Sequence, residues 1–247
     1  MNFPLILAFL FVVGSSVGWL LELVYRNLHR EGGKWINPGF CTGPYVPLYG
    51  FGLCILYLIA SLEKYNLIAS PFWNKVVLFT VMAVCMTLIE YVAGILCLKV
   101  LKVRLWDYSD NWGNIQGIIC PLFSAAWAVL GAVYYFAVHP RILSALDWLS
   151  RNLAFSFFIG MFFGVFLIDV AHSAHLTVRL KKLAEDNHMV VKYEALKEHI
   201  RAAQQKRTGK YNFFRPFHSD RPLGEHLREM RDAYEKRSEE RLRGNKK

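Results

Sequence analysis

The chain has 247 residues, of which 54% are hydrophobic and 19% charged, and its formal net charge is +10. Its apolar residues gather into long runs, which excludes an ordinary soluble domain with short amphipathic periods. P-loop, HExxH, GxSxG and glycine-rich dinucleotide motifs are all absent from the sequence. The chain therefore carries no recognisable nucleotide-binding domain of its own.

Five apolar runs follow one another along the chain. Each approaches the ~20 residues that a helix needs to cross a ~30 Å hydrocarbon core. Transmembrane barrels instead alternate polar and apolar residues over roughly ten-residue segments, a pattern not seen here. The sequence therefore predicts an all-α integral membrane protein with about five transmembrane helices, near residues 3–25, 46–62, 76–98, 117–138 and 153–176.

Irregular backbone precedes the second run. Residues 36–52 read INPGFCTGPYVPLYGFG, and neither proline nor glycine propagates a helix well. Lipid cannot satisfy free backbone N–H and C=O groups, so such backbone must be buried in protein or face water. We expect a re-entrant or broken segment that shapes a polar site, with a plain interfacial loop as the alternative.

A similar irregular entry, GNIQGIICPLFS at residues 113–124, precedes the fourth run. In both cases the preceding apolar run holds a glutamate, Glu22 or Glu90. Paired hydrophobic segments with broken starts are typical of transporters built from repeats. The pattern indicates a weak internal repeat.

Three carboxylates fall inside the apolar runs, where an ionisable group needs a partner or a function. Glu22 and Arg26 are four residues apart, which suits an ion pair on one helix face. Glu90 has no basic neighbour in sequence, so it takes a partner from another segment or is neutral. Asp169 belongs to DVAHSAH, whose spacing of three spreads its ionisable residues around a helix. We assign no metal site and no cofactor.

The loop RLWDYSDNWGNIQG at 104–117 combines aromatic and polar residues. Such residues cap turns or anchor a loop at the membrane interface, but they also fall on the same side of the membrane as the glutamates. We therefore expect Glu90, Asn37, Tyr49 and Asp107 to converge in space. No catalytic residue is assigned. The candidate ligand-binding residues are Glu22, Arg26, Asn37, Tyr45, Tyr49, Glu90, Trp106, Asp107, Tyr108, Asn114 and Ser124.

The chain divides into a transmembrane core, 1–176, and a basic tail, 177–247. The tail carries 19 Lys and Arg against 11 Asp and Glu, so the positive-inside rule predicts an outer N-terminus and a cytoplasmic C-terminus. Helical spacing predicts tail helices over 178–206 and 224–243. We expect the core to fold without the tail.

A basic, aromatic break separates the two predicted tail helices. Phe213, Phe214 and Phe217 could insert into an anionic inner leaflet, and a solvated charged tail is the alternative. No nucleic-acid-binding motif is present, so no specific nucleic acid is expected.

Several ordered motifs resemble a known family. GWLLELVYRN, GKWINPGFCTGPYVPLYGFG, WDYSDNWGNIQGIICPLFSAAW and an HP pair at 139–140 are similar to the bacterial family labelled putative ABC-transporter permease, type IV. The resemblance covers about residues 14–172 and leaves the tail outside. It implies a multi-helix protein of the cell membrane, and it transfers no catalytic assignment.

Three functions are consistent with these features. The first is a transport component powered by a separate ATPase, which the resemblance and the broken entries favour. The second is an intramembrane enzyme or binding protein for an inner-leaflet lipid or lipid-linked substrate, which the one-sided polar cluster suits. The third is a membrane scaffold whose tail recruits a partner.

Overall fold

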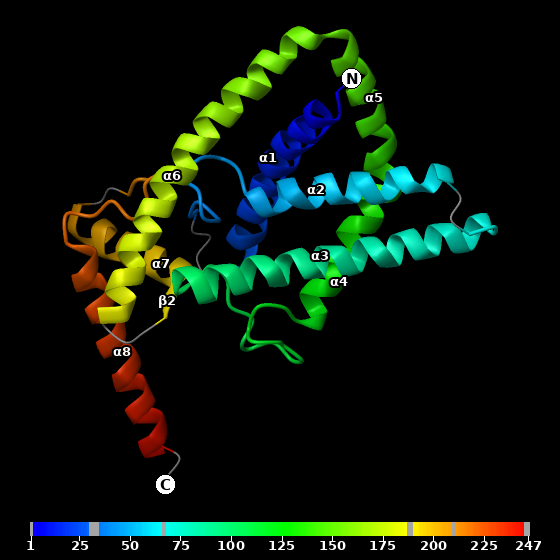
Figure 1. Cartoon of the computed structure of the whole chain (residues 1–247). Coiled ribbons are helices and arrows are strands. Elements are labelled where there is room, and N and C mark those ends of the chain that lie inside the picture. The colour runs from blue at the N-terminus through cyan, green and yellow to red at the C-terminus, as the bar shows by residue number, and fades with distance from the viewer. Residues whose placement is uncertain (1, 30–34, 66–67, 187–189, 209–210, 245–247) are drawn as a thin grey trace.

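The computed structural model describes residues 2–29, 35–65, 68–186, 190–208 and 211–244. Its secondary structure is almost entirely helical, and Figure 1 shows the arrangement. The elements in chain order are α1 (Phe3–His29), α2 (Pro47–Ala60), the 3-10 helix η1 (Ser61–Tyr65), α3 (Pro71–Leu101), β1 (Val103–Arg104), α4 (Pro121–Val133), the π-helix η2 (Tyr134–Val138), α5 (His139–Arg151), the 3-10 helix η3 (Leu153–Phe155), α6 (Ser156–Asp186), β2 (Val191–Lys192), α7 (Tyr193–Thr208) and α8 (Leu223–Gly244).

Five helical stretches in the described residues are long and apolar enough to span a membrane. This confirms the predicted all-α membrane fold. The fourth stretch is longer than predicted, because η2 joins α4 to α5 in one bent helix (Figure 1). The stretches are Phe3–Leu28, Pro47–Tyr65, Pro71–Leu101, Pro121–Arg151 and Leu153–Leu183.

Helices α1 and α2 cross at a point where glycine is required. A Cβ atom added at Gly18 would lie 2.2 Å from the Cβ of Tyr49, and one added at Gly50 would lie 2.2 Å from the hydroxyl of Ser15. Small residues allow two membrane helices to approach closely. The crossing therefore fixes where Tyr49 points.

The segment between α1 and α2 re-enters the membrane region. The amide of Val46 donates to the carbonyl of Ser15 at 2.9 Å, and Ser15 lies about 21 Å along α1 from His29 at 1.5 Å per residue. The indole of Trp19 donates to the Asn37 side chain at 2.7 Å. The irregular backbone is thus packed against α1 inside the protein, as re-entrant backbone must be.

The segment between α3 and α4 is held by its own hydrogen bonds. Lys102 ends α3 in the left-handed conformation, with a φ of 55°. The Trp106 indole then donates to the carbonyl of Ile118 at 2.9 Å, and the Ile115 amide donates to the carbonyl of Ile119. The loop therefore folds back toward α3 before α4 begins at Pro121.

The described residues form two apolar cores. The larger core lies among the membrane helices, and includes Leu10, Leu56, Met82, Trp127 and Tyr135. The second joins the tail to the ends of α3 and α6, and consists of Val103, Leu180, Val191, Tyr193, Leu196, Ile200 and Leu227. The side of the membrane region where α7 and α8 lie is called the tail side below.

The predicted tail helix over 178–206 is wrong, because the structure divides it. Residues 178–186 continue α6 through the proposed domain boundary, and α7 begins only at Tyr193. Leu180 on α6 and Leu196 on α7 both enter the second core. Strand β2 lies between the two helices in sequence and pairs in parallel with β1, with Val191 opposite Val103.

Candidate functional site

Glu22 on α1 is fully partnered. Arg26 Nε donates to Glu22 Oε1 at 2.6 Å, which confirms the predicted ion pair one turn apart. The Tyr49 hydroxyl donates to Glu22 Oε2 at 2.9 Å. Arg26 also pairs through Nη1 with Glu194 Oε2 on α7, at 2.7 Å. One arginine therefore balances two carboxylates, one from the membrane core and one from the tail.

Glu90 on α3 has fewer partners. Its side chain is buried, with 3% of the residue exposed, and its Oε1 accepts a hydrogen bond of 3.0 Å from the Tyr108 hydroxyl. Oε2 is buried and has no hydrogen-bond partner, although Trp127 lies within reach of the carboxylate. In the part of the chain that the structure describes, no cation pairs with Glu90. As predicted, Glu90 takes its partner from another segment; that partner is the neutral hydroxyl of Tyr108.

Aromatic rings join the two glutamates into one group. The Tyr108 ring stacks on Phe123 of α4 at 4.2 Å, and the Tyr49 ring lies 5.1 Å from the Trp127 ring. Glu22 is close enough to Glu90 for their charges to interact. The two-glutamate site is therefore defined here as Glu22, Arg26, Tyr49, Glu90, Tyr108 and Trp127.

Tyr45 belongs to a different cluster. Its hydroxyl donates to Asp169 Oδ2 on α6 at 2.5 Å. The amides of Thr42 and Gly43 donate to the same carboxylate, at 3.0 and 2.8 Å. Asp169 thus fixes the re-entrant segment. His172, three residues further along α6, is exposed.

Asn37 lies beneath a lysine from the tail. Lys197 on α7 is 1% exposed, and its Nζ donates to the carbonyls of Asn37 and Gly39, each at 2.9 Å. The same ammonium pairs with Glu194 Oε1 at 3.1 Å. Tyr193 adds a hydrogen bond to the carbonyl of Phe40 at 3.2 Å. The start of α7 thus satisfies carbonyls that the irregular backbone leaves free.

Asp107 joins a third network at the tail side. Its carboxylate pairs with Arg104 at 2.8 Å and with Lys192 at 2.8 Å, and it accepts a hydrogen bond from Ser109. Burial alone would raise the pKa of Asp107, but the hydrogen bonds from Lys192 and Ser109 outweigh it and lower the pKa to about 2. This carboxylate is therefore ionised and engaged.

The remaining candidates support the second loop. Trp106 anchors it to Ile118. Asn114 bridges the carbonyls of Ser109 and Asn111 and accepts from the Gly117 amide. Ser124 lies in the first turn of α4 and is half-buried. Trp106 and Asn114 hold the loop that carries Tyr108. Among the described residues, none of the three candidates makes a hydrogen bond to either glutamate.

The expected convergence is therefore partial. Tyr49 and Glu90 belong to one site, whereas Asn37 and Asp107 bond to Lys197 and Lys192 of the tail. Sequence reasoning missed the tail residues altogether. Nothing in YEALKEHI singles out Glu194 or Lys197, because both occur in an ordinary charged helix.

The fold and the site define a multi-pass α-helical membrane protein with a re-entrant segment and a pair of intramembrane glutamates. A family model described as putative ABC-transporter type IV matches residues 9–174, which is well over half of the chain, and the chain belongs to that family. No curated protein and no solved structure matches the chain. Every member of the two-glutamate site lies within the matched residues, whereas α7 and α8 lie beyond them.

Proposed function

We propose that this protein is the membrane component of a transport complex in the cell membrane, driven by a separate ATPase subunit. Membership of a transporter-related family supports this. The chain has no nucleotide-binding motif, so ATP-driven transport requires a second subunit. In this proposal the two-glutamate site handles the transported solute, from the cytoplasmic half of the membrane.

The observation that carries the proposal is the unpartnered oxygen of Glu90. A buried acceptor without a donor costs about 1–3 kcal/mol, and intramembrane carboxylates typically mark substrate or ion pathways. Glu22 is neutralised by Arg26, so Glu90 is the carboxylate left to bind a solute. A solute that donates a hydrogen bond or carries a positive charge would supply the partner that Glu90 Oε2 lacks.

The tail offers a physical link between an ATPase and this site. Arg26 lies between Glu22 in the core and Glu194 in the tail. A partner that moved α7 would change the charge balance at Arg26, and with it the bond between Glu22 and Tyr49. Population shifts of this kind need only a differential interaction between two states.

The test is the substitution Glu90→Gln, which keeps the shape and removes the charge. The tagged wild-type chain, purified from its own membranes in mild detergent, should bring with it a P-loop ATPase at fixed stoichiometry and measurable ATP hydrolysis. The E90Q variant should still copurify with that ATPase and should melt at the wild-type temperature. Its rate of ATP hydrolysis should differ from that of the wild type. A wild-type chain that purifies alone and without ATPase activity contradicts the proposal.

The orientation belongs to the same proposal, because an ATPase must meet the tail in the cytoplasm. Tyr234 on α8 is 72% exposed, so a cysteine there is open to reagents once the five native cysteines are replaced. We expect Tyr234→Cys to resist a membrane-impermeant thiol reagent in intact cells and to react after lysis. Labelling in intact cells would place the tail outside.

The second candidate is a site for an inner-leaflet lipid, favoured by the position of all these polar networks toward the tail side. In that case the basic break at 206–224 meets anionic lipid, and Phe214, which is 48% exposed, inserts. Phe217 is committed elsewhere, since its ring packs on Tyr193 at 4.8 Å. A phosphate would also need Arg26, whose guanidinium already holds two carboxylates. Retention of a phospholipid that E90Q and R26K both lose would favour this candidate.

A further inference from the structure

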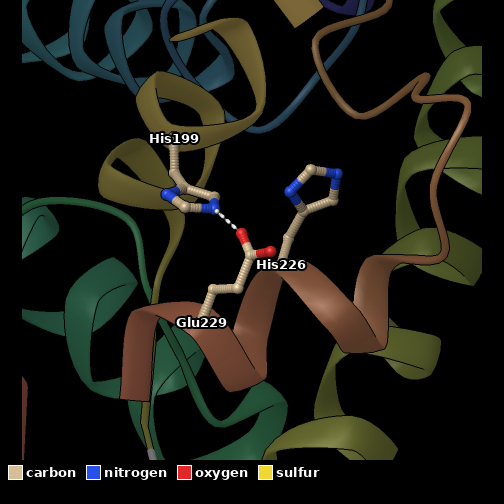
Figure 2. A group of neighbouring side chains, drawn as sticks. All are labelled: His199, His226 and Glu229. Carbon is tan, nitrogen blue, oxygen red and sulfur yellow. Dashed lines mark hydrogen bonds and ion pairs between the residues drawn. The ribbon is translucent and has the colours of Figure 1, made fainter. Parts of the chain in front are cut away.

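Two histidines and a glutamate meet between the tail helices. His199 lies on α7, and His226 and Glu229 lie one turn apart on α8 (Figure 2). Each offers one ligand atom, and these atoms lie within 4.8 Å of one another. His199 Nε2 and Glu229 Oε2 are already 3.0 Å apart. Among the described residues this is the one group of three such side chains close enough to share an ion.

His226 is the unusual member of the group. It is completely buried, and its Nδ1 has no hydrogen-bond partner. Figure 2 shows one ring nitrogen of His226 turned toward Glu229 and His199. The other nitrogen, Nε2, lies 2.8 Å from the Ser219 hydroxyl. A buried polar atom without a partner is rare and calls for an explanation.

Ser219 sets the chemistry of that ring. If Nε2 carries the proton and donates it to Ser219, the lone pair of Nδ1 faces the other two side chains. Metal-binding histidines use the same arrangement, in which the second nitrogen donates to an oxygen that fixes tautomer and orientation. With its proton on Nε2, His226 is a neutral imidazole, which is the form that a metal ligand requires.

We infer that His199 Nε2, His226 Nδ1 and a Glu229 carboxylate oxygen form a binding site for a zinc ion between α7 and α8. Two imidazoles and one carboxylate, with water in the fourth position, are a common tetrahedral zinc ligand set. The site rests on residues outside the two-glutamate site and goes beyond the proposed transport function.

The donor set selects among metals. Imidazole ligands suit zinc and its transition-metal neighbours, whereas magnesium and calcium prefer oxygen ligands. Tetrahedral zinc places neighbouring ligand atoms about 3.3 Å apart, close to the present separation of His199 and Glu229. Arg221 pairs with the other Glu229 oxygen, Oε1, and with Glu225. Its charge opposes a bound cation, but it also holds the Glu229 side chain in place.

The ion would clamp α8 to α7. Helix α7 carries Lys197 and Glu194, which hold the re-entrant segment and Arg26. The clamp therefore stabilises the part of the tail that contacts the membrane core. In solution this appears as a higher melting temperature when zinc is present, because a ligand that binds only the folded state stabilises it.

The experiment uses the full-length chain in detergent, with a tag that contains no histidine, and zinc alone as the probe. Binding is measured by competition with a chromogenic chelator, and the ligands by zinc X-ray absorption. The variants are His199→Ala, His226→Ala and Glu229→Gln. His218→Ala is the matched control, because His218 is exposed in the same tail and outside the cluster. Melting without metal identifies any variant that fails to fold.

We expect one zinc per wild-type chain, bound through two imidazoles, and equal binding by H218A. The affinity for zinc should fall roughly tenfold or more in each of the three ligand variants. Ser219→Ala should lower it about tenfold, because it removes the hydrogen bond that orients His226. Zinc should raise the melting temperature of the wild type and H218A only. Equal zinc binding by wild type and H226A, or an equal loss in H218A, overturns the site, as does a wild-type chain that binds no zinc.

Discussion

The membrane core contains two halves of similar plan. In the first half, α1 carries Glu22, an irregular segment follows, and α2 begins at a proline. In the second half, α3 carries Glu90, an irregular loop follows, and α4 begins at a proline. In each half a tyrosine near the irregular segment donates to the glutamate, Tyr49 to Glu22 and Tyr108 to Glu90.

The halves differ in how the charge is balanced. Glu22 has Arg26 four residues away on its own helix, whereas Glu90 has no cation among the described residues and keeps one oxygen free. An intramembrane ion pair with good hydrogen bonds is mainly structural. An unpaired intramembrane carboxylate lowers stability, and such groups typically mark a functional site. The same local plan thus supports a fixed partner in one half and an open position in the other.

The tail contacts the two halves differently as well. On the first half, Lys197 is buried against two backbone carbonyls of the re-entrant segment. On the second half, Lys192 pairs with Asp107 while its own side chain is 59% exposed. Exposed pairs contribute little, while buried charge-assisted bonds contribute more. The polar contacts of the tail are therefore more buried on the first half, whereas its apolar core and its strand pairing join it to β1 at the end of α3 and to α6.

Arg26→Met should cause the largest loss of stability. It also makes the two halves alike, because it removes the cation that pairs with Glu22. It leaves Glu22 and Glu194 without their shared cation, and breaking a buried pair costs about 3–5 kcal/mol. The measurement is thermal unfolding in detergent. The double variant Glu22→Gln/Arg26→Met should recover part of the loss. A single variant as stable as the wild type would mean that Glu22 needs no cation.

Lys197→Met should cost about 2–3 kcal/mol, because it strips the carbonyls of Asn37 and Gly39 of a charged donor. Lys192→Met is the matched control, with a change below about 1 kcal/mol expected for an exposed pair. Both are measured by melting temperature and by protease cleavage of the tail. Equal effects would show that the tail is not anchored by the first half. These contacts also argue against the expectation that the core folds without the tail, which a chain ending at Lys182 would test.

Tyr108→Phe and Tyr49→Phe compare the two glutamates directly. Tyr108→Phe leaves Glu90 without its hydrogen bond and should lower the stability of the protein by about 1–3 kcal/mol. Tyr49→Phe leaves Glu22 paired with Arg26 and should lower it by only about 0.5–1.5 kcal/mol. Chemical denaturation of both variants under one condition gives the comparison. If Y49F proves the more harmful, the partners of Glu90 are more complete than the contacts indicate.

The smallest effect is expected at Asp107, because solvent screens its pair with the exposed Lys192 and reduces the stability that its lowered pKa would otherwise supply. Its folded pKa of about 2 lies below the ordinary 3.8, so its contribution is complete above 3.8 and is lost as the pH falls toward 2. Asp107→Asn should therefore lower the melting temperature slightly at neutral pH, and the difference from wild type should vanish at the acid end. A difference that persists at low pH would assign the effect to something other than the charge.

Much of the core could be predicted from sequence. Run length alone located the five spans, and the four-residue spacing of Glu22 and Arg26 predicted their ion pair. The proline and glycine content of residues 36–52 indicated re-entrant backbone, which the bond between Val46 and Ser15 bears out for 36–46, whereas 47–52 are helical because α2 begins at Pro47. These features depend on local residue spacing or on whether a segment meets lipid or water. Both can be inferred from residues that are close together in the sequence.

Only the tertiary structure decided which polar groups meet. The sequence grouped Glu90 with Asn37 and Asp107, but long-range packing assigned those two residues to Lys197 and Lys192 of a tail that looked independent. His199 and His226 are likewise brought together by the packing of α7 on α8. Local sequence determined that this chain has membrane helices and where their backbone breaks. Partners that are distant in sequence are set by how apolar surfaces pack, which no local pattern encodes.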